Sequence, residues 1–458
     1  MSTDTYEKPR PGLVGEIGIT SLTVKGQGVG SYGPYTVRVR GALLGDTVVV
    51  RFKKVRHRRK ECEATLVSHQ SMGVERVTPS CSHFGVCGGC LWQDVGYVDQ
   101  LQVKQDLVLN SLKPDSSVEI GESMPAPDAL GYRNKMEFSF GIGETGLVEV
   151  GLHPAGRFGM IFDLARCELV PPVVSKIVEH VRAYANDRSL PAYNLRSHEG
   201  LLRFLTIREG TQTGQIMVII TTSSEPFPGV EELGAELTDR FPDVVSVIHT
   251  INTEKAQVAF GDENRVIAGK STIEDRLGPF SFEISSSSFF QPNTLQAERM
   301  FGQVVSLAEL TGQDRVLDAY CGTGGISFFL SQEAGRVLGV EVSEESIRDA
   351  VKNSANNSIQ NCEFMSGPAE DLLGQLCDQG ETFDVVVADP PRAGMHHRAL
   401  RSLVDLDAQT VVYVSCNPAA LANDVGTLEA HGYTLDYLQL VDMLPQTPHC
   451  EVLARLRK

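Results

Sequence analysis

The feature that most constrains this fold is a change of rhythm near residue 284, where strand-like apolar runs begin to alternate with helical stretches. Such alternation is typical of a parallel sheet with helices on both faces. Four of the apolar runs stop at a polar or tightly turned segment, at 315–320, 337–341, 383–389 and 411–416. Because open parallel sheets bind ligands beyond the carboxyl ends of their strands, we expect these four ends to border one crevice.

The first of these strands runs into the glycine loop 321–325, which lets the backbone approach a ligand closely. The loop lacks the G-x-G-x-x-G spacing of a dinucleotide site. The next strand ends in Glu341, sixteen residues beyond Gly325, where a carboxylate can accept both hydroxyls of a ribose. An adenosine without phosphates fits this crevice better than NAD does. The pattern therefore predicts a Rossmann-like methyltransferase fold that uses S-adenosylmethionine.

The fourth strand leaves the thiol of Cys416 at its end, directly before an Asn-Pro turn. A cysteine at a strand end beside a cofactor crevice is placed to act as a nucleophile. A buried structural cysteine explains the same stretch equally well, so the stretch alone does not choose between the two.

Three further cysteines are closely spaced, as Cys81-x5-Cys87-x2-Cys90, with glycines between them. Thiols this close on a flexible loop predict a metal site that holds either zinc or an iron–sulfur cluster. A fourth ligand is required, and both Cys62 and Cys167 are available. Their spacing does not decide between them.

The residues before this loop, 13–69, form short apolar runs separated by glycines, which predicts a small closed β-barrel. Seven cations fall within the ten positions 51–60, and they form either a phosphate-facing strand or a solvated charged edge. After the loop, residues 97–112 are predicted as an amphipathic helix ended by Lys-Pro.

From 132 to 282 the pattern is strand-rich with two helical interruptions, near 173–186 and 229–240, which predicts a mixed α+β domain. Residues 132–135 are a candidate RNA-facing edge of that domain. Beyond it, Asn293 and Gln296 are a plausible capping pair for a helix that continues to Leu310.

Length and composition set the broad class. At 458 residues the chain is long enough for about three domains. The formal charge of −17 argues mildly against nucleic acid as a partner, but the acidic balance and the basic stretch belong to different regions. No apolar run approaches the roughly 18 residues that span a bilayer, and the polar N-terminus is unlike a signal peptide. Clustered thiols without a secretory signal predict a reducing, cytoplasmic location.

Six short motifs follow one another along the chain: Cys81/Cys87/Cys90 with Cys167, Phe290-Gln291-Pro292-Asn293, Asp318-x-x-Cys321-Gly322, Asp389-Pro390-Pro391-Arg392, Ser415-Cys416-Asn417-Pro418 and His449-x-Glu451. Together they resemble the bacterial RNA uracil-C5 methyltransferases, and the resemblance covers nearly the whole chain. This family includes the enzymes for 23S ribosomal RNA and for the T-loop of transfer RNA. The chain is most similar to the 23S type, which carries both a TRAM domain and an iron–sulfur cluster; the turn at 41–46 is characteristic of TRAM.

The resemblance implies a multidomain α/β architecture. An OB-like TRAM barrel occupies 8–69, and an α+β central domain with the iron–sulfur loop occupies 70–96 and 125–283. A Rossmann-like S-adenosylmethionine-dependent methyltransferase domain occupies 97–124 and 284–458.

The resemblance also implies roles for individual residues. Cys416 is the nucleophile that adds to C6 of uracil, and Glu451 is the base that takes the C5 proton. The cofactor contacts are Gln291, Tyr320, Glu341 and Asp389, and the ligands of a [4Fe–4S] cluster are Cys81, Cys87, Cys90 and Cys167. Gly325 and Pro368 depart from the family pattern, so backbone groups would have to replace the usual side-chain contacts there.

The implied substrate is a uridine of 23S ribosomal RNA in a single-stranded or loop segment, because the base must leave its stack to reach a thiol. Neither a membrane nor an obligate protein partner is implied. Three alternatives stay open. One is an enzyme of the transfer-RNA branch, which typically lacks the barrel and the cluster. Another is a non-catalytic, metal-stabilised RNA-binding protein. The third is a DNA or amino-group methyltransferase, in which an aromatic residue usually stands where this chain has Arg392.

Overall fold

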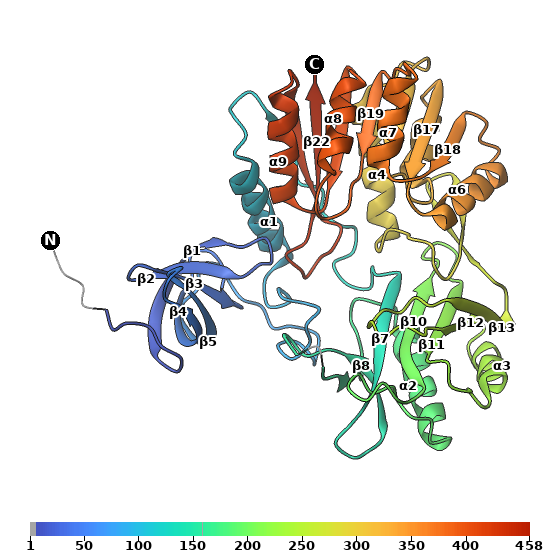
Figure 1. The fold of residues 1–458 in the computed structure, drawn as a ribbon. Coiled ribbons are helices and arrows are strands. Elements are labelled where there is room, and N and C mark those ends of the chain that lie inside the picture. The colour runs from blue at the N-terminus through green and yellow to red at the C-terminus, as the bar shows by residue number, and fades with distance from the viewer. Residues whose placement is uncertain (1–5, 158) are drawn as a thin grey trace.

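The computed structural model describes residues 6–157 and 159–458; the polar start of the chain, residues 1–5, and residue 158 lie outside it. Figure 1 shows three bodies: an N-terminal barrel, a central domain, and a C-terminal domain beside which helix α1 (Tyr97–Leu112) lies. Among the described residues, none of the helices is both long and apolar enough to cross a membrane.

The N-terminal strands close into a barrel in the order β1-β2-β3-β5-β4, as the glycine spacing predicts. Their bounds are β1 (Val14–Leu22), β2 (Gly28–Tyr32), β3 (Tyr35–Arg40), β4 (Thr47–Arg56) and β5 (Glu61–Ser71). Alternate side chains point inward, and Val37, Val39, Val48 and Val50 are completely buried. The barrel therefore has an apolar core of its own.

The basic stretch 51–60 forms the end of β4 and the turn after it. Lys54 pairs with Glu63 at 4.0 Å and Arg56 with Glu61 at 3.4 Å, both across to β5. This strand is therefore partly neutralised by its neighbour, while Arg51 and the other cations of the stretch point to solvent.

The central sheet has the order β13-β12-β11-β10-β7-β8-β9 within the described residues. Its strands are β7 (Lys135–Ile142), β8 (Val148–Leu152), β9 (Phe162–Asp163), β10 (Leu202–Glu209), β11 (Ile216–Thr222), β12 (Val244–Ile251) and β13 (Glu263–Gly269). Helices α2 (Pro172–Asp187) and α3 (Val230–Arg240) pack on one face, close to their predicted positions. On the other face Met217, Ile219 and Ile248 share a core with the C-terminal domain. The two sheets are thus joined by one apolar interface.

A hairpin of β14 (Ile273–Leu277) and β15 (Phe280–Ile284) leads into the C-terminal sheet, whose order is β18-β17-β16-β19-β20-β22-β21-β6. Its strands are β6 (Glu119–Ile120), β16 (Arg315–Ala319), β17 (Arg336–Glu341), β18 (Cys362–Ser366), β19 (Val385–Ala388), β20 (Thr410–Ser415), β21 (Thr434–Val441) and β22 (Glu451–Arg457). Strands β16 to β20 run parallel, as the strand–helix alternation predicts. The sheet therefore has the methyltransferase arrangement expected from the sequence.

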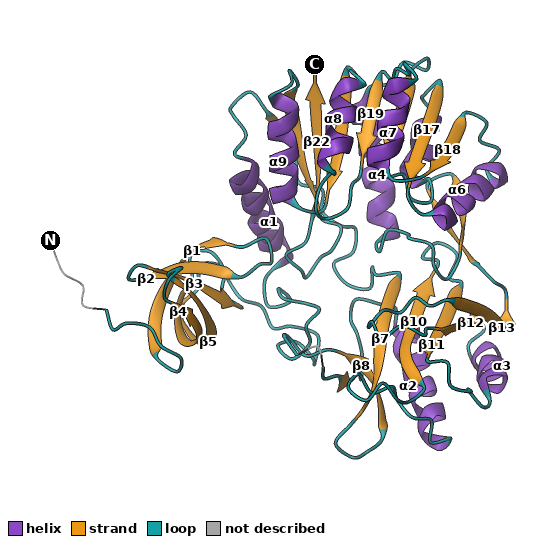
Figure 2. Cartoon of the chain, viewed as in Figure 1, coloured by secondary structure: helices purple, strands orange, loops and turns teal. Residues whose placement is uncertain are grey.

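Helices cover both faces of this sheet (Figure 2): α1, α4 (Thr294–Ala308), α5 (Gly325–Ser331), α6 (Glu344–Asn356), α7 (Ala369–Asp378), α8 (His397–Asp405) and α9 (Pro418–Glu429). The side chain of Asn293 accepts a hydrogen bond from the N–H of Gln296, so the predicted cap of α4 is confirmed.

The segment that leads into β7 connects the central domain to the C-terminal domain. Tyr132 and Asn134 are buried, so the prediction of an RNA-facing edge at 132–135 is wrong for these two residues. The hydroxyl of Tyr132 donates to the carbonyl of Pro445 at 3.1 Å, and Nδ2 of Asn134 donates to the carbonyl of Gln291 at 2.7 Å. Their polar groups tie the central domain to loops of the C-terminal domain instead of facing solvent.

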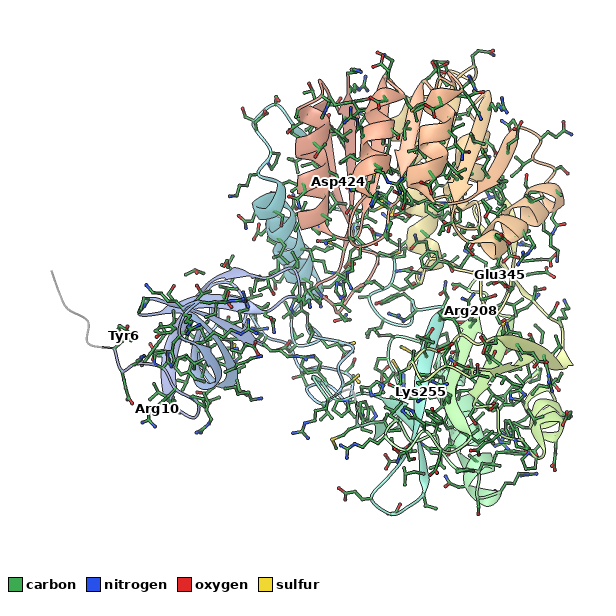
Figure 3. All side chains as sticks on the ribbon, viewed as in Figure 1. Tyr6, Arg10, Arg208, Lys255, Glu345 and Asp424 are labelled. Atoms are coloured by element: carbon green, nitrogen blue, oxygen red, sulfur yellow. The ribbon has the colours of Figure 1, made fainter. Side chains whose placement is uncertain are left out.

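Polar contacts also cross the junction between the central and C-terminal domains. Figure 3 labels two of the residues involved, Arg208 of β10 and Glu345 of α6. Arg208 donates to the carbonyl oxygens of Ser285 and Ser288, and the hydroxyl of Ser287 donates to Glu345. The loop 285–288 is thus held from both domains.

The barrel meets the rest of the molecule in a small apolar cluster of Leu43, Trp92, Val95 and Val103. Leu43 comes from the barrel, Trp92 and Val95 from the loop after the cysteines, and Val103 from α1. The backbone N–H groups of Leu91 and Trp92 donate to the carbonyl of Gln446 at 2.9 and 3.1 Å. Barrel, thiol loop and C-terminal domain therefore meet around Trp92.

Candidate functional site

Five of the predicted cofactor and catalytic residues lie at one edge of the C-terminal sheet. Four of them end or directly follow the parallel strands β16, β17, β19 and β20, namely Tyr320, Glu341, Asp389 and Cys416. Strand β22 runs antiparallel to β20 with Ser415 opposite Val452, so Glu451 begins its strand beside the end of β20. Strand topology alone therefore gathers these side chains at the edge where ligands of such sheets bind.

The crevice lies where the chain changes the direction in which it adds strands. After β16 it adds β17 and β18 on one side, and then β19 and β20 on the other. Tyr320 follows β16 in a left-handed conformation, with φ at 69°, and turns the chain into the glycine loop. Burial raises the pKa of Tyr320 to about 12, so its hydroxyl stays protonated and can donate a hydrogen bond.

The carboxylate of Glu341 is held by backbone N–H groups at the mouth of the crevice. Its Oε2 accepts from Gly322 at 3.3 Å, and its Oε1 accepts from Ser343 at 2.9 Å. The N–H of Gly367 donates to the carbonyl of Glu341 at 2.9 Å, which brings the turn at Pro368 beside the strand end. Glu341 is thus oriented before any ligand arrives, and Pro368 offers backbone groups only.

Gln291 lies in the loop between β15 and α4. The hydroxyl of Thr323, in the glycine loop, donates to the carbonyl of Phe289 at 3.4 Å and links the two loops. A Cβ added to Gly325 would lie 2.9 Å from the ring of Phe301 in α4. Close packing against α4 therefore accounts for glycine at this position.

Three desolvated carboxyl groups border the crevice. Burial raises the pKa of Asp318 and of Asp389 to about 7 each, and burial followed by the charge of Asp389 raises the pKa of Glu451. The hydroxyl of Ser327 donates to Oδ2 of Asp318 at 2.5 Å, but Oδ1 finds no hydrogen-bond partner among the described residues. Carboxylates held this way favour a ligand that brings positive charge, such as a sulfonium or an ammonium group.

Cys416 is half-buried at the end of β20, where a tight turn fixes it. The N–H of Asn417 donates to the hydroxyl of Ser415 at 3.1 Å, and Nδ2 of Asn417 donates to the carbonyl of Arg392 at 2.9 Å. Burial raises the pKa of the Cys416 thiol to about 11, with the Glu451 carboxylate acting in the same direction and the Arg392 guanidinium opposing both. The thiol must therefore lose a proton before it can act as a nucleophile at neutral pH.

A hydrogen-bonded pair that the motifs did not reveal lies beside this thiol. Nη2 of Arg392 contacts Nδ1 of His449 at 2.6 Å. Burial, together with the charge of Arg392, lowers the pKa of His449 to about 4, so the imidazole is neutral. Because a guanidinium can only donate, the neutral ring accepts from Arg392 at Nδ1, and its Nε2 also lies 3.3 Å from the same nitrogen of Arg392. The sequence presented His449 only as part of the motif that ends in Glu451.

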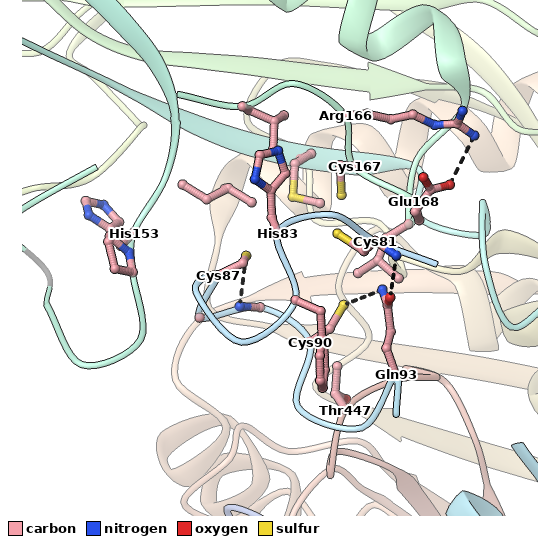
Figure 4. Close-up of a pocket in the computed structure, with 18 of the residues that line it drawn as sticks. Cys81, His83, Cys87, Cys90, Gln93, His153, Arg166, Cys167, Glu168 and Thr447 are labelled. Carbon is pink, nitrogen blue, oxygen red and sulfur yellow. Dashed lines mark hydrogen bonds and ion pairs between the residues drawn. The ribbon is translucent and has the colours of Figure 1, made fainter. Parts of the chain in front are cut away.

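The four cysteines predicted as metal ligands line one cavity of about 350 Å³ (Figure 4): Cys81, Cys87, Cys90 and Cys167. Gln93, itself buried, accepts from the N–H of Cys81 at 3.2 Å and donates to Sγ of Cys90 at 3.4 Å. The N–H of Gly89 donates to Sγ of Cys87 at 3.3 Å. Hydrogen bonds to sulfur of this kind are typical of thiolate sites.

Of the two available fourth ligands, Cys62 lies in the barrel core and Cys167 lies in this cavity. In the described part of the chain, the structure shows no group of three or more His, Cys, Asp or Glu residues that could hold a metal ion. Zinc needs all its sulfur ligands within about 2.3 Å of one point, whereas an iron–sulfur cluster spreads its thiolates around a larger body. Burial raises the pKa of Cys90 to about 12 and of Cys167 to about 11, so a bound cation is needed to keep these thiols ionised.

Comparison with known proteins adds three findings. A family model described as tRNA (uracil-5-)-methyltransferase matches residues 232–458. An uncharacterized RNA methyltransferase of Listeria monocytogenes is 35% identical over 96% of this chain and 96% of its own, and one of Clostridium tetani is 37% identical over 95% and 94%. The crystal structure of Pyrococcus abyssi tRNA (uracil-54, C5)-methyltransferase in complex with S-adenosyl-L-homocysteine is 28% identical, with a TM-score of 0.78, over 96% of this chain and 99% of that chain.

Proposed function

The chain belongs to the RNA uracil-C5 methyltransferases, enzymes that use S-adenosylmethionine, and from this premise we propose that it methylates C5 of a uridine in 23S ribosomal RNA through Cys416 and Glu451. The observation that carries the proposal is the juxtaposition of that thiol and that carboxyl group at the adjoining ends of β20 and β22, beside the cofactor crevice.

In the proposed reaction the Cys416 thiolate adds to C6 of uracil, and the electron pair of the C5–C6 double bond moves toward C5 and the O4 carbonyl. Bound S-adenosylmethionine supplies the electrophilic methyl group that C5 then takes. Glu451 removes the C5 proton, and the returning electron pair expels the Cys416 thiolate from C6. A desolvated carboxyl group with a raised pKa suits a group that must hold a proton during this step.

We assign cofactor binding to Gln291, Tyr320, Glu341 and Asp389. Support comes from the oriented Glu341 carboxylate, which suits ribose hydroxyls, and from the desolvated Asp389, which suits positive charge. We assign a [4Fe–4S] cluster to the four thiols of the 350 Å³ cavity, in a structural role, because methyl transfer requires no redox step. The ten free cysteines agree with a cytoplasmic location.

A transfer-RNA T-loop uridine is the second candidate substrate. The archaeal transfer-RNA enzyme aligns over 96% of this chain, so it shares more than the catalytic domain with it. The presence of a barrel and a thiol loop before the catalytic domain therefore does not by itself favour ribosomal RNA as the substrate. The choice of ribosomal RNA rests on the resemblance of the six sequence motifs to the 23S type.

Nucleoside mass spectrometry on RNA from a strain that lacks this gene tests the proposal. The strain is complemented with the wild type, with Cys416→Ala, or with Cys377→Ala, a half-buried cysteine on α7 outside the crevice. We expect 5-methyluridine to disappear from 23S RNA and to return with the wild type and Cys377→Ala only. Loss from transfer RNA instead would move the enzyme to the other branch, and full rescue by Cys416→Ala would refute the role of the thiol.

A further inference from the structure

A second cavity, of about 730 Å³, opens on Cys416. Its volume is in the range of cavities that enclose a small organic ligand. Three parts of the chain line it: the barrel through Lys25 and Arg40, the thiol loop 87–91 through Gly88 and Leu91, and the C-terminal domain through Arg392 and Cys416. A nucleotide held at the thiol would therefore contact the barrel as well as the catalytic domain.

The barrel reaches this cavity through the turn between β1 and β2. Gly26 is buried in that turn with φ at 69°, and a Cβ added to it would lie 2.7 Å from Cβ of Pro448 and 3.2 Å from the ring of Trp92. The turn is therefore seated directly against the loop that leads to Glu451. This contact fixes the neighbouring Lys25 at the cavity.

The charge of the lining differs from that of the whole molecule. The chain carries 58 acidic against 41 basic residues, but the described residues that line this cavity include Lys25, Arg40 and Arg392 and no carboxylate. Arg392 is engaged by His449, whereas Lys25 and Arg40 are exposed and form no ion pair within the described chain. Two free cations beside a site for a flipped base fit the phosphates of an RNA backbone.

The thiol loop is the wall between the two cavities. Cys87 and Cys90 line the thiol cavity, Leu91 lines the cavity with Cys416, and Gly88 lines both. Arg40, at the end of β3, also lines both, and the charge of Cys87 acts on its guanidinium. Arg40 therefore borders the four thiols on one side and the cavity of Cys416 on the other.

We propose that Lys25 and Arg40 form a phosphate subsite next to the target uridine, and that a filled thiol site holds Arg40 in that subsite. The subsite rests on the proposed function, because it presumes RNA at Cys416. Occupancy of the four thiols then controls RNA affinity without any part in the chemistry.

The test measures binding of a short single-stranded RNA, in two unrelated uridine-containing sequences, as a function of salt concentration. The full-length enzyme is used both with its iron and after iron removal, as the wild type and as Arg40→Gln. We expect Arg40→Gln to weaken binding of both sequences by about tenfold and to reduce the salt slope by about 1. Iron removal should weaken RNA binding by the wild type to a similar extent. It should change RNA binding by Arg40→Gln by less than about twofold, since iron removal and the substitution act through one contact.

Two further variants serve as controls. Arg38→Gln removes an equal charge from the same strand but outside the cavity, where Arg38 pairs with Glu61 at 3.7 Å. Its RNA affinity should stay within about twofold of the wild type. Arg40→Lys keeps the charge and should keep the salt slope. Iron content and visible absorbance of each variant report whether the cluster site is intact.

The inference would be overturned if Arg40→Gln left the salt slope unchanged. It would also be overturned if iron removal weakened RNA binding by the same factor in Arg40→Gln as in the wild type. Formation of 5-methyluridine by the wild type is measured in parallel. If the wild type makes none, the proposed function fails. If it makes the product while Arg40→Gln binds RNA normally, only the subsite fails.

Discussion

At the scale of single residues, the reactivity of Cys416 depends on opposing charges around it. The Glu451 carboxylate raises the pKa of the thiol beyond what burial does, and Arg392 lowers it. A ligand that brings positive charge to the neighbouring carboxyl groups would offset their effect and favour the thiolate. In the proposed reaction, binding of the methyl donor and activation of Cys416 are therefore linked through charge as well as through position.

If Asp389 contacts the cofactor as proposed, its pKa, raised to about 7, predicts that cofactor binding depends on pH. Below pH 7 this carboxyl group is protonated and attracts a cationic ligand less, whereas above pH 7 it is ionised. We expect S-adenosylmethionine to bind up to about tenfold more tightly at pH 8 than at pH 6, which follows from one group titrating at about 7. Calorimetry without RNA measures this directly.

Substitution of Asp389 identifies the titrating group. Asp389→Asn should weaken binding at pH 8 and flatten the pH profile, leaving the slope that Asp318 contributes through its own pKa of about 7. Asp405→Asn, an exposed carboxylate at the end of α8, should preserve the profile. If Asp389→Asn keeps the full slope, another group controls the cofactor.

At the scale of elements, helix α1 is attached to the catalytic loop by polar groups rather than by the leucines that its amphipathic pattern emphasises. Nζ of Lys104 donates to Oδ1 of Asp442 at 2.5 Å and to the carbonyl of Leu444 at 3.1 Å, and both members of the ion pair are completely inaccessible. Gln100 is buried as well and donates to Oε1 of Gln446 at 2.9 Å. The helix thereby holds the segment that precedes Glu451.

Removing one partner of this buried pair should be costly. Lys104→Met leaves the Asp442 carboxylate buried without its cation, and we expect a loss of about 3–5 kcal/mol in the free energy of unfolding. The double variant Lys104→Met/Asp442→Leu should recover most of that loss, because it removes both charges. Urea titration compares the three proteins; a loss below about 1 kcal/mol in the single variant would show that water reaches the carboxylate.

The same helix shows what a sequence can predict and what it cannot. Its bounds, 97–112, and the cap at Asn293 follow from local signals, and so do the parallel strands that position Cys416. The burial of Lys104 depends on Asp442, which lies 338 positions further along the chain, and no local pattern encodes such a pairing. The contact between Arg392 and His449 and the convergence of Lys25 and Arg40 on one cavity were missed for the same reason.

At the scale of the whole molecule, four separate parts contact the loop 442–450 that leads to Glu451. Helix α1 bonds Asp442, the central domain bonds Pro445 through Tyr132, the thiol loop bonds Gln446, and the barrel turn packs on Pro448. Glu451, the proposed general base, is therefore positioned by the assembled molecule and not by its own domain alone.

A substitution that separates the barrel from the loop 442–450 should therefore affect catalysis, although it lies outside the C-terminal domain. Gly26→Val would force the β1–β2 turn away from Pro448, and we expect RNA affinity and turnover each to fall by about tenfold while S-adenosylmethionine binding is kept. Gly12→Val is the matched control, because Gly12 also has a positive φ, 89°, but a Cβ there meets nothing within 4 Å. The Gly12→Val variant introduces the backbone strain of a positive φ, about 1–2 kcal/mol, without a steric conflict. Equal effects of the two variants would assign the loss to strain in the barrel.

Trp92 is the sole tryptophan of the chain, and it lies 2% exposed where barrel, thiol loop and α1 meet. Its fluorescence is therefore a built-in optical reporter of whether these three parts are assembled. An emission maximum at short wavelength, shielded from a soluble quencher, corresponds to the docked state. A red shift on removal of the proposed cluster, or in Gly26→Val, would reveal the barrel's release in an unlabelled protein and in real time.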